Sequence, residues 1–326
     1  MRRDGLDAKA IDEAVSRLVA GELVAFPTET VYGLGARADD DAAVAKVFAV
    51  KGRPVGHPLI VHVVDRAAAA PFVATMPDVA ERLIEAFWPG PLTVIVPRAP
   101  DCASAAAGGQ PTIGLRCPAH PVAHALLLAA RAAGVPGLAA PSANRFGRVS
   151  PTTAQHVVDE FGDDLLVLDG GAARVGIESA IVDCSSDRPA LLRPGVLTLE
   201  QIEAALGSPL ASAGVDSPRA PGTLESHYAP RARLRLMPTP MLQAALQVLG
   251  SEPLKLAVYS RSVPSGVATG VLHRRMPARP EQAAHELFAV LRELDEQGVH
   301  LIWVEEPPAD PAWDGVRDRL RRAAAP

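Results

Sequence analysis

The chain has 326 residues, of which 48% are hydrophobic, a formal net charge of −5 and a mean hydropathy of +0.13. This composition can bury a sizeable core, so it excludes intrinsically disordered and fibrous proteins. A length of 326 residues favours two domains of ordinary size. Every apolar stretch is interrupted by a charged residue, glycine or proline before about 18 residues, which excludes a membrane-spanning helix.

The N-terminus and the cysteines both favour a cytoplasmic protein. The first four residues, Met-Arg-Arg-Asp, lack the apolar core of a signal peptide. Cys102, Cys117 and Cys184 are an odd number of cysteines and lack metal-ligand spacing. We therefore expect neither a disulfide framework nor a zinc site.

Charge is unevenly distributed along the chain. Residues 1–216 carry 18 Lys and Arg against 25 Asp and Glu, whereas residues 217–326 carry 14 against 12. No run of Lys and Arg resembles a nucleic-acid-binding stripe. The sequence therefore argues against duplex binding driven by bulk charge, and any contact with a polyanion must be local.

Helix-like and strand-like patterns alternate over the first two thirds of the chain. Helices are predicted by apolar period at 6–20, 42–50 and 121–133, and by cap residues from 150 and at 198–206. Ser150 is the expected N-cap of the fourth helix, and Thr198 with Gln201 forms a capping box in the fifth. Short apolar runs predict strands at 23–26, 59–64, 92–96, 137–140, 165–168 and 180–182. Without obvious hairpin signals, this alternation predicts an α/β sheet covered by helices.

The composition changes after residue 206. Residues 207–230 are rich in Pro, Gly and Ser and have no periodicity, which is typical of a linker. Beyond them, strands are predicted at 254–259 and 299–304, and a helix at 282–294. Trp313, Val316 and Leu320 give a last helix its apolar stripe. We predict a first domain over 1–206, a linker over 207–230 and a small α/β domain over 231–326.

The string Gly33-Leu34-Gly35-Ala36-Arg37-Ala38 matches the dinucleotide-binding pattern G-x-G-x-x-G/A. That pattern must follow a strand directly and open a helix. Six residues separate the predicted strand from Gly33, and three aspartates follow, which would repel a pyrophosphate. The chemistry and spacing therefore argue against a nicotinamide or flavin site.

Two early segments carry denser chemistry. Residues 27–35 supply hydroxyls, a carboxylate and a phenol after a predicted strand, where α/β sheets bind ligands; a polar turn capped by its own threonines is the alternative. The cationic side chains of Lys51 and Arg53 could bind a polyphosphate. The alternative is that they lie at a helix C-terminus, where the helix dipole favours positive charge. His62 lies on a predicted strand, where a hydrogen-bonded core histidine is the alternative.

Later segments repeat this arrangement at strand ends. Small and polar residues follow a strand at 140–144, and Arg116 and Arg193 stand at two further strand ends. The predicted helix N-terminus at Ser150 would add an anion site. No paired catalytic carboxylates and no Ser/His/Asp order are present, so the pattern favours aligning an anionic substrate over supplying a nucleophile.

Five strings, in order and spacing, resemble the YrdC-like family over about residues 8–206. They are Phe26-Pro-Thr-Glu-Thr-Val-Tyr-Gly-Leu-Gly35, Lys51-Gly-Arg-Pro54 with His57-Pro58-Leu59, Trp88-Pro-Gly-Pro-Leu-Thr93, Ala140-Pro-Ser-Ala-Asn144 and Leu192-Arg-Pro-Gly195. The segment Ala220-Pro-Gly-Thr-Leu-Glu-Ser-His-Tyr-Ala-Pro230 and the extra domain resemble the longer threonylcarbamoyl-AMP synthases. The resemblance implies a twisted mixed sheet with helices, followed by a smaller Rossmann-like α/β domain.

The resemblance also implies a reaction. L-threonine, bicarbonate and ATP would give threonylcarbamoyl-AMP and pyrophosphate, for threonylcarbamoyladenosine modification of tRNA. Mg²⁺ is expected on phosphate oxygens and water, so no protein metal site is expected. A tRNA or a tRNA-modifying transferase is a possible partner.

By motif position, the resemblance assigns residues to two substrates. Lys51 and Arg53 are the expected catalytic residues. The L-threonine side comprises Thr30, His62, Arg116, Ala140 and Ser179. The ATP side comprises Lys51, Arg53, His57, Thr112, Ser142, Asn144, Ser150, Arg193 and Tyr228. The linker would close over ATP through Tyr228.

Two departures and two alternatives accompany these assignments. Ala180 stands where a threonine is common in the family, and residues 223–226 replace a basic and aromatic stretch. A non-catalytic YrdC-like RNA-binding module is the alternative function, although the acidic first domain argues against strong affinity. A carbamoyl-transferring maturation factor would need zinc-finger and acylphosphatase-like segments that are absent from the sequence.

Overall fold

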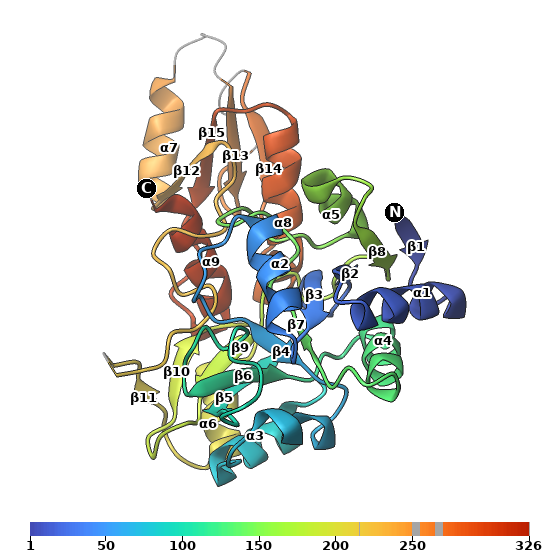
Figure 1. Ribbon diagram of the computed structural model, residues 1–326. Helices are drawn as coiled ribbons and strands as arrows, with labels where there is room; N and C mark the ends of the chain where they lie inside the picture. The colour runs from blue at the N-terminus through green and yellow to red at the C-terminus, as the bar shows by residue number, and fades with distance from the viewer. Residues whose placement is uncertain (215, 250–254, 265–269, 326) are drawn as a thin grey trace.

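Two β-sheets, one of eleven strands and one of four, organise the chain in the computed structural model (Figure 1). The structure describes residues 1–214, 216–249, 255–264 and 270–325. The large sheet is built from residues 2–212 and the small sheet from residues 233–305. We call these parts the large-sheet domain and the small-sheet domain.

The large sheet is mixed, with the order β1-β8-β2-β3-β7-β4-β6-β5-β9-β10-β11. Consecutive strands β2 and β3, β5 and β6, and β9 and β10 pair antiparallel, although the sequence carries no obvious hairpin signal. The strands are β1 (Arg2–Asp4), β2 (Val24–Phe26), β3 (Gly33–Arg37), β4 (Ile60–His62), β5 (Leu92–Pro97), β6 (Thr112–Arg116), β7 (Leu138–Ala139), β8 (Leu166–Asp169), β9 (Ala180–Asp183), β10 (Ala190–Arg193) and β11 (Ala211–Ser212).

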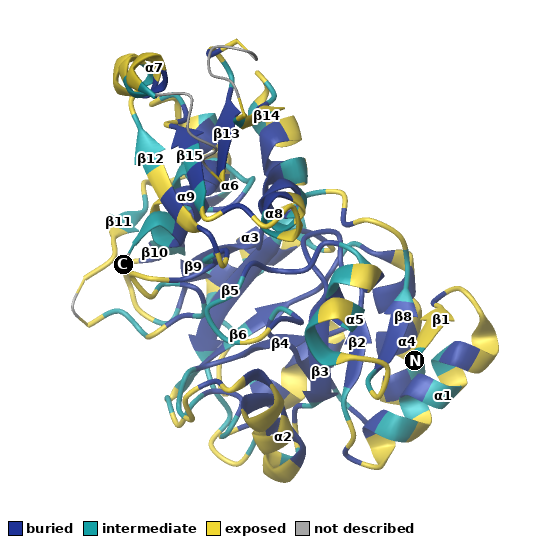
Figure 2. Cartoon of the chain, turned by 90° about the horizontal axis from the view of Figure 1, so that it is seen from above, coloured by how far each residue is buried: buried dark blue, intermediate teal, exposed yellow. Residues whose placement is uncertain are grey.

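Helices cover this sheet, and their caps explain where most of them begin. They are α1 (Ala8–Val19), α2 (Asp41–Lys51), α3 (Asp78–Phe87), α4 (Pro121–Ala132), α5 (Ala154–Phe161) and α6 (Leu199–Leu206), with a 3₁₀ helix at Ala67–Phe72. Asp40 caps α2, and the predicted capping box of Thr198 and Gln201 starts α6. Figure 2 shows exposed outer helix surfaces around buried central strands.

One predicted helix start is wrong. Thr153, rather than Ser150, is the N-cap of α5, and its hydroxyl accepts a hydrogen bond from the His156 backbone N–H. The Ser150 hydroxyl instead donates to the carboxylate of Glu178, 28 residues away. Ser150 therefore offers no helix N-terminal anion site.

The glycine pattern at 33–38 begins strand β3 and does not form a turn between a strand and a helix, so it lacks the setting of a dinucleotide site. Gly33 pairs with Phe26, and Gly35 pairs with Val24. A Cβ at Gly35 would lie 2.8 Å from Cε1 of Phe26. These glycines thus make room for an aromatic ring of the neighbouring strand.

The small sheet is entirely parallel, with the order β12-β15-β13-β14. Its elements are β12 (Arg233–Met237), α7 (Thr239–Val248), β13 (Leu256–Ser260), β14 (Leu272–Arg275), α8 (Pro280–Glu296), β15 (Leu301–Glu305), a 3₁₀ helix at Pro311–Trp313 and α9 (Asp314–Ala324). Position 254 of the predicted strand at 254–259 lies outside the described residues. Helices α8 and α9 share one apolar cluster and α7 belongs to another.

The two domains pack directly on each other. The cluster under α8 and α9 continues into the large-sheet domain through Val31, Val149 and Ile177. A Cβ at Gly315 in α9 would lie 2.4 Å from the carbonyl oxygen of Gly195, and one at Gly176 would lie 2.3 Å from that of His285. Backbone therefore meets backbone at two points of this contact. In the described part of the chain, no helix is long and apolar enough to cross a membrane.

Candidate functional site

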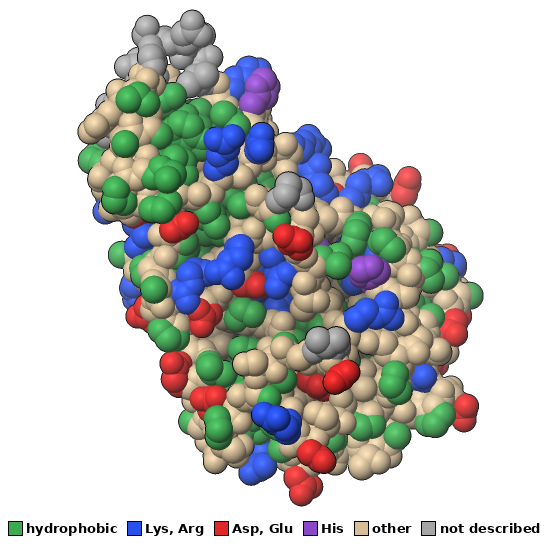
Figure 3. All heavy atoms as spheres, turned by 90° about the vertical axis from the view of Figure 1, so that its left-hand side faces the viewer, with side chains coloured by type: hydrophobic (Ala, Val, Ile, Leu, Met, Phe, Trp, Pro, Cys, Tyr) green, Lys and Arg blue, Asp and Glu red, His purple; other side chains and the backbone are tan. Residues whose placement is uncertain are grey.

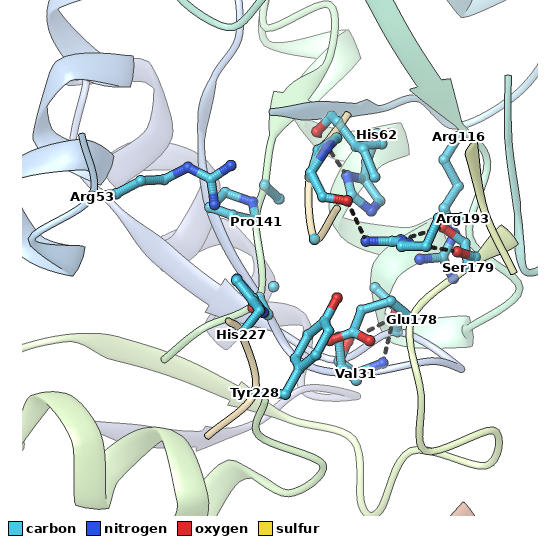
Figure 4. A pocket seen from close by; sticks show the side chains of 17 residues that line it. Val31, Arg53, His62, Arg116, Pro141, Glu178, Ser179, Arg193, His227 and Tyr228 are labelled. Carbon is cyan, nitrogen blue, oxygen red and sulfur yellow. Dashed lines mark hydrogen bonds between the residues drawn. The ribbon is translucent and has the colours of Figure 1, made fainter. Parts of the chain in front are cut away.

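A cavity lies between the large-sheet domain and the predicted linker (Figure 4). Its walls come from the loop after β2, the loops after β7 and α2, the segment before β9, the end of β10, and linker positions 221, 222, 227 and 228. The predicted site residues that line it are Arg53, His62, Arg116, Ala140, Ser142, Ser179, Arg193 and Tyr228. Chain segments far apart in the sequence thus meet at one place.

Six other predicted site residues do not line this cavity. They are Thr30, Lys51, His57, Thr112, Asn144 and Ser150. Thr112 lines a smaller neighbouring cavity, which shares Ile60 and Pro221 with the first. The ring of His57 lies edge-on to Phe146, at a centroid distance of 5.9 Å.

Lys51 fixes the loop that follows β7. Its ammonium donates to the carbonyl oxygen of Ser142 over 2.6 Å and also to that of Asn144. Burial, together with the nearby Arg53, lowers the pKa of Lys51 well below its usual value. These two hydrogen bonds fix the backbone of the loop at Ser142 and Asn144, and Ser142 lines the cavity from this loop.

The loop after β2 is held by its own threonines, as the alternative interpretation proposed. The Thr28 hydroxyl donates to the carbonyl oxygen of Val31 over 2.6 Å and accepts from two backbone N–H groups. The hydroxyls of Thr28 and Thr30 lie 2.8 Å apart. The turn nevertheless reaches the site, because Thr28, Val31 and Gly33 line the cavity.

Arg116 forms a buried ion pair behind the cavity wall. Its Nη2 lies 2.7 Å from Oε1 of Glu29, while Oε2 of Glu29 accepts from the Ala119 N–H over 3.0 Å. Nε of Arg116 donates to the carbonyl oxygen of Gly90. These contacts fix the orientation of the guanidinium at the end of β6.

Arg193 links the sheet to the linker. Its Nε and Nη2 donate to the carbonyl oxygen and hydroxyl of Ser179, over 3.0 and 3.2 Å, and Nη1 donates to the carbonyl oxygen of Pro221 over 2.9 Å. The Ser179 hydroxyl lies 2.8 Å from that of Thr93. Arg193 therefore aligns Ser179 and anchors the linker at the same time.

Three buried polar atoms of cavity-lining residues have no hydrogen-bond partner among the described residues. They are Nε of Arg53, Nδ1 of His227 and the hydroxyl of Tyr228. The Tyr228 hydroxyl points into the cavity in Figure 4. Because an unpaired buried polar group costs about 1–3 kcal/mol, such atoms indicate a polar ligand.

Both histidines of the cavity are neutral. Burial, with nearby Arg116, lowers the pKa of His62 to about 3, and burial lowers that of His227 to about 3 against the attraction of Glu178. The lining contains three guanidinium groups, those of Arg53, Arg116 and Arg193, and one carboxylate, that of Glu178. The fixed charge of the cavity therefore suits an anion.

Sequence reasoning missed Glu178, Thr93 and the partner of Arg116. Glu178 is the clearest omission, since a carboxylate between buried Ile177 and Ser179 needs a buried partner. The sequence shows Glu29 only as the carboxylate of the polar loop 27–35 and does not indicate that it pairs with Arg116. Among the described residues, no group of three His, Cys, Asp or Glu side chains could hold a metal ion.

The linker forms part of the cavity wall, and its path there requires a glycine at position 222. A Cβ at Gly222 would lie 2.2 Å from the Tyr228 hydroxyl and 2.8 Å from Nη1 of Arg193, and its φ is +72°. Linker residues 223–226 do not line the cavity; the Thr223 hydroxyl instead donates to the carbonyl oxygen of Ala220.

Gly222→Ala should therefore displace the linker and lower the activity at this cavity by at least about tenfold, and a side chain at positive φ should also cost about 1 kcal/mol of stability. Gly214→Ala is the matched control, since nothing lies within 4 Å of that Cβ position. Activity assays and thermal melts on both variants check this expectation. Equal activity of the two variants would contradict it.

Comparisons with known proteins find family matches over nearly the whole chain. Residues 16–195 match the family described as telomere recombination, and residues 197–325 match the family described as threonylcarbamoyl-AMP synthase, C-terminal domain. The threonylcarbamoyl-AMP synthase of Bacillus subtilis is 38% identical over 96% of this chain and 92% of its own length. A putative threonylcarbamoyl-AMP synthase of Mycobacterium tuberculosis is 40% identical over 63% of this chain and 93% of its own length.

A solved structure agrees with this placement. The crystal structure of Pyrococcus abyssi Sua5 complexed with L-threonine has a TM-score of 0.88 and 34% identity, covering 99% of this chain and 96% of that one. The predicted fold class, a mixed α/β sheet followed by a smaller α/β domain, is confirmed. The names of the relatives favour a synthase over a non-catalytic RNA-binding module. The chain belongs to the YrdC-like family, in the long form of the threonylcarbamoyl-AMP synthases.

Proposed function

We propose that this chain makes threonylcarbamoyl-AMP from L-threonine, bicarbonate and ATP. Threonine, as the free amine, and bicarbonate give a carbamate and water. A carbamate oxygen then attacks the α-phosphorus of ATP, and pyrophosphate leaves. The observation that carries the proposal is the set of unpartnered atoms of Arg53, His227 and Tyr228 in one cavity with three guanidinium groups.

L-Threonine would lie at the Arg116 end of the cavity. One edge of the Arg116 guanidinium is already held by Glu29, and a substrate carboxylate would accept from what remains of the fork. His62, Ala140 and Ser179 line the same cavity and would contact the rest of the amino acid. Thr30 would act through Thr28, whose hydroxyl it contacts.

ATP would lie toward Arg53, Arg193 and Tyr228. Among the described residues, the Arg53 side chain makes one hydrogen bond, from Nη2 to the carbonyl oxygen of Pro58, so its remaining donors can serve a phosphate. Ser142 would be presented by the Lys51-bound loop, with Asn144 in the same loop. Thr112 would extend this side into the neighbouring cavity, and His57 would flank it. Ser150 would act through Glu178.

Mg²⁺ would enter on the substrate as MgATP. The one carboxylate in the lining, that of Glu178, is engaged by Ser150 and Arg319. The donor set of the cavity is therefore cationic and neutral, which suits phosphate oxygens rather than a bare metal ion. The linker over the cavity would exclude water from the adenylate, which is open to hydrolysis.

The product would supply a transferase that places the threonylcarbamoyl group on a tRNA adenosine. We expect that partner, rather than this chain, to bind the tRNA. On the face in Figure 3, Lys and Arg side chains are interspersed with Asp and Glu and form no continuous basic surface. A cytoplasmic location would suit this role and agrees with three free cysteines.

Pyrophosphate release by the purified chain tests the proposal. Release should require threonine, bicarbonate and ATP together, and mass spectrometry should detect threonylcarbamoyl-AMP. Leaving out threonine or bicarbonate is the control. Pyrophosphate release without threonine, or tight RNA binding without release, would contradict the proposed reaction.

A further inference from the structure

One arginine of the last helix extends from the small-sheet domain to the large-sheet domain. Arg319, in α9, is fully buried. Its Nε and Nη2 donate to Oε2 and to the backbone carbonyl of Glu178, over 2.8 and 3.0 Å. Its Nη1 donates to the carbonyl oxygen of Pro194 and to Asp318, each over 2.8 Å. All three nitrogens of this side chain are therefore used, and two of them reach the large-sheet domain through Glu178.

Arg319 touches three separate segments that form the cavity. Glu178 precedes Ser179, Pro194 follows Arg193, and the Arg319 guanidinium lies 5.4 Å from the ring centroid of Tyr228. Glu178, Ser179, Arg193 and Tyr228 all line the cavity. One buried group therefore fixes the relative positions of two strand-end segments and the linker.

The backbone contacts between the domains support this arrangement. Gly315, one turn before Arg319, meets the carbonyl oxygen of Gly195, and Gly176, before Glu178, meets that of His285 in α8. Both segments held by Arg319 are thus also in close contact with the small-sheet domain. Arg319 enters at the centre of this contact, where its guanidinium is shielded from water.

We propose that Arg319 is a positioning residue of the active site, by which the small-sheet domain orders Glu178, Ser179 and the Arg193–Pro194 segment for catalysis. The proposal rests on the proposed function and adds a role for the C-terminal domain beyond covering the cavity. Arg319 acts through these residues, since it does not itself line the cavity.

The charge of Glu178 depends on this contact. Burial raises the pKa of Glu178, but Arg319 and Arg193 outweigh that effect and hold the pKa below its usual value. The Ser150 hydroxyl donates to the same carboxylate, and Lys51, His227 and Tyr228 face it from the other packed segments. Without Arg319, burial would dominate, the pKa would rise, and Glu178 would take up a proton as the pH falls.

Substitutions in the full-length chain test the proposal. Arg319→Met should lower kcat/KM by about 100-fold, because misplaced groups cost that much even when they do not touch the reacting atoms. Arg319→Lys keeps the charge but cannot reach Glu178 and Pro194 together, so it should recover only part of the loss. Arg317→Met is the matched control: Arg317 lies on the same helix, but its partners among the described residues, Pro308, Asp310 and Asp314, all belong to its own domain.

The pH dependence separates positioning from simple loss of stability. Arg319→Met should lose further activity, relative to the unsubstituted chain, as the pH is lowered from about 8 to about 6. Adding Glu178→Gln should remove this further loss of activity at low pH. The double variant should then be no less active than Arg319→Met at about pH 6. If the two substitutions instead multiply their losses, or if Arg319→Met keeps the pH profile of the unsubstituted chain, the proposal is overturned.

Hydrogen exchange provides a test that does not need the proposed reaction. In the substrate-free protein, Arg319→Lys should speed amide exchange in segments 176–180 and 193–196, whereas Arg317→Met should not. Unchanged exchange in these segments overturns the positioning role even where the chain is active. Faster exchange in a chain that releases no pyrophosphate supports the positioning role and contradicts only the proposed reaction.

Discussion

Arg53→Ala should lower kcat/KM for ATP by about 10- to 150-fold, the equivalent of losing one charge-assisted phosphate contact of about 1.5–3 kcal/mol. The fold should survive, because the side chain gives up a single hydrogen bond to protein, that to the Pro58 carbonyl oxygen. Burial lowers the pKa of Arg53 to about 10, so the group stays charged at neutral pH. Pyrophosphate release and thermal melts measure both effects.

Two further variants sharpen this prediction. Arg193→Ala should lose comparable activity but more stability, because Arg193 also holds Ser179 and Pro221. Arg131→Ala is the control for charge alone, since Arg131 is exposed and its side chain bonds to no described residue other than Asp65. Near-normal turnover of both Arg53→Ala and Arg193→Ala would show that these cations do not contact the nucleotide.

Arg116→Lys should raise the KM for L-threonine by about tenfold or more, and by more than it raises the KM for ATP. A lysine ammonium can still pair with Glu29, so the buried carboxylate keeps a counter-ion, but it lacks the fork that a second carboxylate needs. Arg116→Ala would leave Glu29 unpaired and destabilise the fold by about 3–5 kcal/mol, which would confound the assay. Steady-state titration of both substrates on Arg116→Lys is therefore the measurement.

Amino-acid selectivity provides the companion test of the threonine side. Serine should be used less well than threonine by a modest factor, because only a methyl contact is lost. Valine should be rejected far more strongly, because buried polar groups that bond the substrate hydroxyl would be left unpaired. A defect of Arg116→Lys confined to ATP would move this arginine to the nucleotide side.

Local sequence signals predicted the elements whose boundaries are set locally. The helix stop at Lys51 and Gly52 is confirmed, since Gly52 is left-handed at φ +63°. Strand β3 was missed because its glycines lack β-propensity, and it forms by pairing with β2 and β7. The start of α5 was misplaced because the Ser150 hydroxyl bonds to Glu178, a partner that no local pattern reveals.

The site shows the same division between local and distant causes. The family resemblance pointed to Arg116, Ser179 and Arg193, each of which lies in the cavity wall. Their partners, Glu29, Thr93 and Arg319, come from distant segments and could not be paired from sequence. The last helix shows why: its apolar stripe predicted packing, while Arg319 beside it makes the hydrogen bonds to Glu178 and Pro194.

The backbone-to-backbone contact between the domains has a consequence for substrate traffic. Since no methyl group fits between Gly315 and Gly195, the domains cannot slide on one another without breaking that contact. The linker is held at Arg219, which exchanges two hydrogen bonds with Gln110, and at Ala229, whose N–H donates to the Gly147 carbonyl oxygen. Between these points it is also bonded by Arg193 at Pro221 and by Arg322 at Leu224 and His227. If nucleotide and adenylate exchange by opening of this span, the hydrogen bonds of Arg193 and Arg322 to it must break first. How long a labile product stays protected would be set by the opening rate of that span rather than by the chemistry that forms it.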